Sequence, residues 1–131
     1  MKLTVVGAAG VRTPHLVKAI VDQSKDLGIS KISLMDIDGE RLRLLNSVIQ
    51  DMFLDYETQP NISITTDSKE ALEDTDFVIF TIRVGNTEGR AWDESIPLKY
   101  GVLGQETTGP GGFAMAMRTI PVILDYVKMI E

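Results

Sequence analysis

The chain has 131 residues, 44% of them hydrophobic and 24% charged, and a net charge of −6. These values are typical of one globular domain. Because there is no cysteine, disulfide scaffolds, thiolate zinc sites and cysteine nucleophiles are excluded, and the single histidine, His15, excludes a multi-histidine metal site. An acidic chain lacks the basic surface that nucleic acids and anionic membranes attract, so we expect neither as a partner.

No apolar run approaches the about 20 residues of a membrane helix. The N-terminal apolar stretch is interrupted at Gly7 and Gly10, which does not fit a secretory signal. We therefore expect a cytoplasmic protein.

The first half of the chain alternates short apolar strands with amphipathic helices. Leu3–Val6 is predicted as a strand, followed by a helix with Thr13 as N-cap, Pro14 at the first helical position and Gly28 at its end. The apolar stripe of this helix is Leu16, Val17, Ile20 and Val21.

A second strand, Lys31–Met35, ends at Asp36, and Asp38 is predicted to cap the next helix. The apolar residues of that helix are Leu42, Leu45, Val48, Ile49, Met52, Phe53 and Tyr56. Pro60 breaks the chain before a third strand, Ile62–Thr65. The remaining predictions are a capping box at Asp67 and Glu70 and a fourth strand, apolar on both faces and therefore central, at Asp76–Ile82.

This alternation predicts the α/β class: a doubly wound, Rossmann-like parallel sheet with strand order 3-2-1-4, covered on both sides. Arg83–Gly112 then carries seven glycines, with a helical part around Arg90–Lys99. Phe113–Ile130 is predicted as a helix that Pro121 kinks. Because such folds continue to later strands, we expect residues 1–131 to be the N-terminal domain of a longer protein. The alternative is a complete four-stranded domain.

The turn after the first strand reads Gly7-Ala8-Ala9-Gly10-Val11-Arg12. Gly7 fits the first position of the dinucleotide fingerprint G-x-G-x-x-G, while Ala9 and Arg12 replace its other two glycines. The N–H groups at the start of the following helix favour phosphate. Asp36 follows Arg12 by 24 residues, near the spacing of about 20 expected for the acidic residue that binds the ribose and selects NAD over NADP.

The segment after the fourth strand carries Arg83, Arg90, Gln105 and Glu106 among its glycines. Ligands of such folds bind at the carboxyl ends of the strands, and arginine suits an anionic group such as phosphate. The glycine content suggests that the backbone approaches something closely. We therefore expect a substrate or cofactor contact here.

The sequence IPLKYGVLGQETTGPGG at 96–112 resembles the signature loop of the family 4 glycoside hydrolases, and Thr13-Pro14, 34–38 and 82–85 match it too. The resemblance covers essentially the whole chain. It implies hydrolysis of phosphorylated disaccharides with NAD and a divalent metal, usually manganese, by a homodimer or homotetramer. The implied reaction oxidises the sugar at C3, eliminates the aglycone, adds water and returns the hydride, and is an exception among glycosidases.

The resemblance also implies roles for single residues. Gly7, Ala8, Ala9, Gly10, Val11, Arg12, Asp36 and Arg83 are matched to the NAD site. Arg90 is matched to a substrate contact, and Glu106 to the glutamate that supports a tyrosine base outside this chain. The metal ligands also lie outside it, so we expect the isolated chain to be inactive.

A 6-phospho-β-glucosidase is the first expectation, with a 6-phospho-α-glucosidase or an α-galacturonidase of the same family as alternatives. A malate-type hydroxy-acid dehydrogenase shares the strand order and the acidic ribose contact, and a nucleotide-binding module without enzymatic activity remains a third possibility.

Overall fold

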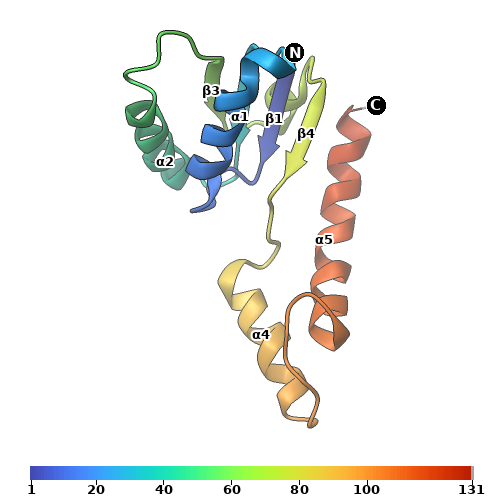
Figure 1. The fold of residues 1–131 in the computed structure, drawn as a ribbon. Coiled ribbons are helices and arrows are strands. Elements are labelled where there is room, and N and C mark those ends of the chain that lie inside the picture. Colours follow the sequence, from blue (N-terminus) through green and yellow to red (C-terminus); the bar gives the residue numbers. More distant parts are fainter. Residues whose placement is uncertain (131) are drawn as a thin grey trace. The chain divides into compact units, whose positions relative to one another are not determined.

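A computed structural model describes residues 1–130, which form two compact units, residues 1–81 and residues 82–129. The expected domain 1–131 ends at Glu131, which lies outside the described residues. The first unit is a parallel sheet with its helices (Figure 1). Its elements are β1 (Lys2–Val6), α1 (Thr13–Leu27), β2 (Lys31–Met35), α2 (Gly39–Met52), β3 (Asn61–Thr65), α3 (Ser68–Leu72) and β4 (Phe77–Phe80). The second unit contains α4 (Asn86–Leu98) and α5 (Gly109–Ile130).

The sheet has the order β3-β2-β1-β4 with every pair parallel, which confirms the predicted topology. In its register Val5 lies between Leu34 of β2 and Ile79 of β4, and Leu34 lies beside Ile64 of β3. Because side chains alternate along a strand, this row and the rows two residues away point to the same face. That face is apolar across the strands.

The core of the first unit lies between this apolar face and helices α1 and α2 (Figure 1). Each helix contributes residues at helical spacing, because one stripe of a helix faces the sheet. The core residues are Leu3, Val5, Ile32 and Leu34 from the sheet, Val17, Ile20 and Val21 from α1, and Leu42, Ile49 and Phe53 from or beside α2.

The opposite face of the sheet carries the five-residue helix α3, and it is polar at its middle row and apolar at the buried Val6 and Met35. The buried Thr4 hydroxyl donates to the Ala71 carbonyl of α3 at 2.9 Å and lies 2.8 Å from the Thr75 hydroxyl. Ser33 and Ser63 occupy the same row as Thr4. The predicted coverage of this face is thus provided in part by α3, which meets buried hydroxyl groups of the sheet.

Of the three predicted N-caps, two are confirmed and one is wrong, and Gly28 ends α1 as predicted. Asp38 accepts the N–H of Arg41 at 3.0 Å, and Asp67 accepts that of Lys69 at 2.8 Å. Thr13 does not cap α1, because Arg12 occupies the N-cap position without a side-chain hydrogen bond and Thr13 is the first, buried, helical residue. The predicted capping box is incomplete, because the Glu70 carboxylate accepts a hydrogen bond from the Thr65 hydroxyl and not from the Asp67 N–H.

The fourth strand, β4, is shorter than predicted and lies at an edge of the described sheet. Its Phe77 side chain is 57% exposed. An apolar sequence predicts that both faces are to be covered, but it does not specify which part of a protein covers them. Within residues 1–130, β4 is the outer strand, as the predicted order 3-2-1-4 requires, and its central position in a longer sheet stays a prediction.

Both helices of the second unit begin earlier than predicted. Gly85, with φ 86°, precedes α4, and Gly109 and Pro110 open α5, where proline suits the first turn. Helix α5 continues through Pro121. None of the helices within residues 1–130 combines the length and apolar character needed to cross a membrane.

Candidate functional site

The turn after β1 is fastened to the ends of the neighbouring strands. Gly7 has φ 93°, a left-handed conformation that glycine adopts without strain. The N–H groups of Gly7 and Ala8 both donate to the Met35 carbonyl of β2, at 2.9 and 3.0 Å. On the other side, the Thr81 hydroxyl donates to the Gly7 carbonyl at 2.9 Å. The tips of β1, β2 and β4 are thereby joined around this turn.

The Asp36 carboxylate is held by two backbone donors at the same place. Its Oδ2 accepts the Ala9 N–H at 2.8 Å, and its Oδ1 accepts the Asp38 N–H at 3.0 Å. Each oxygen keeps a lone pair for a further donor. The structure therefore links Asp36 directly to the glycine-rich turn. Spacing alone did not predict this link, and it engages the Ala9 N–H that the fingerprint would aim at a phosphate.

The residues just before α1 leave donors at the start of the helix. Within residues 1–130, the backbone N–H groups of Val11 and Arg12 donate to no other group. These groups and the helix dipole favour an anion at this end of α1. The Ala9 methyl is buried, while a Cβ at Gly10 would meet its nearest neighbours at 3.7 Å, in ordinary contact. Of the two residues that replace fingerprint glycines, Ala9 is accommodated in the interior and Arg12 is exposed.

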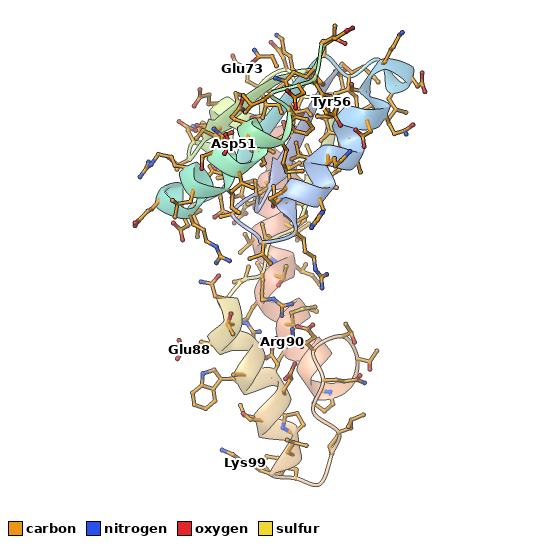
Figure 2. The ribbon with its side chains drawn as sticks, turned by 60° about the vertical axis from the view of Figure 1, so that its left-hand side comes forward. Asp51, Tyr56, Glu73, Glu88, Arg90 and Lys99 are labelled. Atoms are coloured by element: carbon orange, nitrogen blue, oxygen red, sulfur yellow. The ribbon has the colours of Figure 1, made fainter. Side chains whose placement is uncertain are left out.

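In the second unit, the structure brings together the three charged residues that the sequence singled out after β4. Glu106 forms an ion pair with Arg83, and its Oε2 lies 3.4 Å from the Nε of Arg90. The Nε of Arg90 also donates to Glu94 at 2.6 Å. Figure 2 shows Arg90 projecting from α4 on a different side from Glu88. The cluster thus contains two guanidinium groups and two carboxylates.

Electrostatics within this cluster keep Arg90 charged. The hydrogen bond to Glu94 and the neighbouring charge of Glu106 both raise the pKa of Arg90. The Arg90 side chain is 47% exposed, whereas that of Glu106 is 21% exposed. The Nε of Arg90 lies 2.6 Å from a Glu94 oxygen and 3.4 Å from a Glu106 oxygen. The half-exposed guanidinium group is the part of this cluster that an anionic ligand could approach.

Sequence reasoning missed a buried ion pair beside the cluster. Asp93 of α4 is 4% exposed, and its two oxygens face the two Nη groups of Arg118 on α5, with the Oδ1–Nη1 distance 2.8 Å. This two-pronged arrangement is the strong form of an arginine–carboxylate pair. Its one sequence signal is that Gly89, Asp93 and Pro97 recur every four residues and form the buried face of α4.

The glycines of the 101–112 segment approach the protein's own backbone. A Cβ at Gly104 would overlap the Glu94 carbonyl, and one at Gly111 would overlap the carbonyl of Gln105 and lie 2.6 Å from that of Asp93. A Cβ at Gly112 would lie 2.6 Å from the Thr107 carbonyl. The predicted close backbone approach is therefore confirmed for these three glycines, and its partner is the protein's own backbone: they let the loop that carries Glu106 pack against α4 and α5.

Comparison with known proteins identifies the family. A family model described as "Family 4 glycosyl hydrolase" matches residues 2–131. A probable 6-phospho-beta-glucosidase of Bacillus subtilis is 41% identical over the whole chain, which covers 30% of that relative. A 6-phospho-alpha-glucosidase of Lacticaseibacillus paracasei is 39% identical over 97% of the chain and is covered to 29%. The chain therefore spans about three tenths of the length of these curated relatives.

Solved structures agree with this result. The 6-phospho-beta glucosidase of Thermotoga maritima, solved with manganese, NAD+ and glucose-6-phosphate, is 38% identical and superimposes with a TM-score of 0.92. The match covers 99% of this chain and 32% of that one. The fold described above is therefore shared with a region of that structure.

We expect Gly104→Ala to destabilise the second unit by about 1–3 kcal/mol, because the added methyl group overlaps a backbone carbonyl that cannot move aside cheaply. Gly101→Asn is the matched control, since nothing lies within 4 Å of its Cβ and asparagine tolerates the left-handed conformation there. Urea denaturation measures both. Equal losses of stability in the two variants would contradict the role assigned to Gly104.

The stability of the second unit is expected to fall in acid. Hydrogen bonds from Arg118 lower the pKa of Asp93 against the opposing effect of burial. A carboxyl whose pKa is lower in the folded state stabilises the fold above its unfolded pKa of about 3.9, and this contribution is lost as the pH falls through the folded pKa. Thermal melting of the parent and of Asp93→Asn checks this. The parent should lose more stability than the variant between pH 6 and pH 3, and parallel losses would contradict it.

Proposed function

The chain belongs to family 4 of the glycosyl hydrolases, and from that premise we propose that it supplies the NAD site and part of the substrate site of an enzyme that hydrolyses phosphorylated disaccharides. A 6-phospho-β-glucoside is the proposed substrate, with the α-anomer as the alternative, because relatives of both kinds match the chain at similar identity. The observation that carries the proposal is the position of Asp36, fixed at the strand tips by Ala9 and Asp38.

The first unit fits the adenosine half of NAD. The oriented Asp36 carboxylate would accept hydrogen bonds from the ribose hydroxyls and would repel a 2′-phosphate. The N–H groups of Val11 and Arg12 at the start of α1 would bind the pyrophosphate. Gly7, Ala8, Ala9 and Gly10 would form the wall of this site. Ala9 would contribute through its bond to Asp36 rather than through a phosphate contact, which refines its predicted role.

The second unit fits the phosphorylated sugar. We propose that Arg90 binds the anionic substrate through its Nη groups, since its Nε is engaged by Glu94 and Glu106. Glu106 would support the catalytic base, as the family resemblance implies. Arg83, proposed as a cofactor contact, would also hold the Glu106 carboxylate. The Thermotoga maritima relative binds glucose-6-phosphate, which supports the phosphosugar as ligand.

When bound, NAD accepts a hydride from the sugar and returns it, so the cofactor carries the redox chemistry. The residues of this chain bind and orient the two ligands. Within residues 1–130, no three histidine or acidic side chains gather as a metal site. We therefore assign the proposed manganese ion no ligand among them and derive no step through it. We propose that residues 1–131 alone are inactive.

The proposal is tested with a protein in which this chain is followed by the further length that its relatives have. It is assayed on p-nitrophenyl 6-phospho-β-glucoside and on the α-anomer, with and without NAD and Mn²⁺. We expect hydrolysis only when both NAD and Mn²⁺ are present. The redox step needs NAD, because neither the side chains nor the metal can replace it. Unphosphorylated p-nitrophenyl glucosides are the control and should react far more slowly.

Hydrolysis of the phosphorylated substrate by protein stripped of NAD would contradict the proposal, as would equal rates on phosphorylated and unphosphorylated glucosides. The ratio of rates on the two anomers decides between β- and α-specificity.

A further inference from the structure

Two consecutive residues of α4 organise the second unit. The Asp93 side chain is buried against Arg118 of α5, while the next side chain, Glu94, bonds the Nε of Arg90. One peptide unit therefore joins a buried ion pair to the exposed cluster assigned to the substrate. A displacement of Asp93 would displace Glu94 with it.

The backbone of the same two residues receives the loop that carries Glu106. Gly104 packs against the Glu94 carbonyl and Gly111 against the Asp93 carbonyl, so close that neither has room for a Cβ. Glu106 lies between these two contacts in sequence. Its position therefore depends on where the backbone of Asp93 and Glu94 lies.

Arg118 reaches a third segment, the one that follows Arg83. Its Nε lies 3.5 Å from the Val84 carbonyl. A Cβ at Gly85 would lie 3.3 Å from this Nε, and a Cβ at Gly89 would lie 3.3 Å from Nη2. The guanidinium group is thus packed between the segment beside Arg83 and the first turn of α4, where glycines leave it space.

From these contacts we infer that Arg118 and Asp93 are a positioning pair, which sets the relative places of Arg83, Arg90 and Glu106 in the substrate site. The inference rests on the proposed function for the meaning of that site, and on the geometry of the second unit for the positioning itself. Arg118 acts through the residues that it holds and is not assigned a contact with the substrate.

The chemistry of the pair favours this role over that of a surface ion pair. An arginine fork bonds both oxygens of a carboxylate and so fixes orientation as well as distance, which a lysine ammonium does not. The pair also contrasts with Asp125 and Lys128 on the same helix, whose side chains are 67% and 72% exposed. Such exposed pairs have little effect on structure.

The test uses three variants of the protein that carries this chain with the further length of its relatives. Arg118→Met removes the charge and the fork but keeps an apolar stem. Arg118→Lys keeps the charge without the fork. Asp125→Asn breaks the exposed pair on the same helix and is the matched control. The measurements are the NMR resonance of the Arg90 Nε–H group, the affinity for glucose 6-phosphate, KM and kcat on the phosphorylated glucoside, the NAD affinity and the Tm.

Arg118→Met is expected to shift the Arg90 resonance and to raise KM and weaken glucose 6-phosphate binding by about 10–100-fold, because misplaced binding groups lose affinity steeply. NAD affinity should fall less than the phosphosugar affinity, since Arg83 is the one proposed NAD contact that the pair positions and the other NAD contacts belong to the first unit. Arg118→Lys should fall between the parent and Arg118→Met. Asp125→Asn should leave every value unchanged. A folded Arg118→Met protein with a lower Tm but an unchanged Arg90 resonance, KM and phosphosugar affinity would overturn the inference.

If the parent neither hydrolyses phosphorylated glucosides nor binds glucose 6-phosphate, the proposed function fails. The Arg90 resonance then still decides the positioning: a shift in Arg118→Met supports it, and no shift overturns it. If Arg118→Met does not fold, Arg118→Lys is decisive by the same resonance, because it preserves the charge that stabilises Asp93.

Discussion

The first unit depends on one carboxylate that binds two backbone N–H groups. Asp36 stands where β2 ends and ties the turn after β1 to the start of α2 through Ala9 and Asp38. Without it, the ends of two parallel strands would be joined here mainly by the two bonds to the Met35 carbonyl. Because the carboxylate is held from both sides, it presents a fixed negative charge at the carboxyl ends of the strands, where ligands of doubly wound folds bind. A binding group that is already oriented loses less freedom when its ligand arrives.

In the second unit, charged groups are likewise held in place by partners, here through side-chain ion pairs and through close backbone contacts at glycines. Its carboxylates do not stand alone: Asp93 is matched by a guanidinium fork, and Glu106 lies beside two arginines. The glycines at 104 and 111 allow backbone to meet backbone, so that a polar loop is ordered with few apolar contacts. Order in this unit therefore comes from charge pairing and close backbone approach, in contrast to the apolar core of the first.

Much of the fold could be predicted because it follows from local rules. Strand and helix periodicity gave the parallel order, and the spacing of Asp38 and Asp67 from their helices gave two caps. The error at Thr13 arose because threonine is a common cap, whereas here Thr13 is buried as the first residue of the helix. The edge position of β4 followed from the predicted order, but an apolar sequence does not specify what covers the strand.

The candidate site was predictable in its composition and not in its connections. Arg83, Arg90 and Glu106 were singled out as candidate ligand contacts, and the structure gathers them into one cluster. Their contact with a ligand stays a prediction. The Asp93–Arg118 pair was missed because its residues are 25 positions apart and no spacing rule links them. The glycines predicted a close backbone approach correctly, but they did not specify that its partner is the protein's own backbone.

Asp36 is the proposed recognition group for the cofactor ribose, and calorimetry of NAD and NADP binding to the parent and to Asp36→Asn tests this role directly. Asp38→Asn is the matched control, because Asp38 is a neighbouring carboxylate that caps α2. The parent should bind NAD more tightly than NADP, and Asp36→Asn should reduce this preference by about tenfold or more, since the charge that repels a 2′-phosphate is gone. The ratio uses both cofactors, so a loosened turn that weakens them equally does not affect it. An unchanged ratio in Asp36→Asn, or an equal change in Asp38→Asn, would contradict the account.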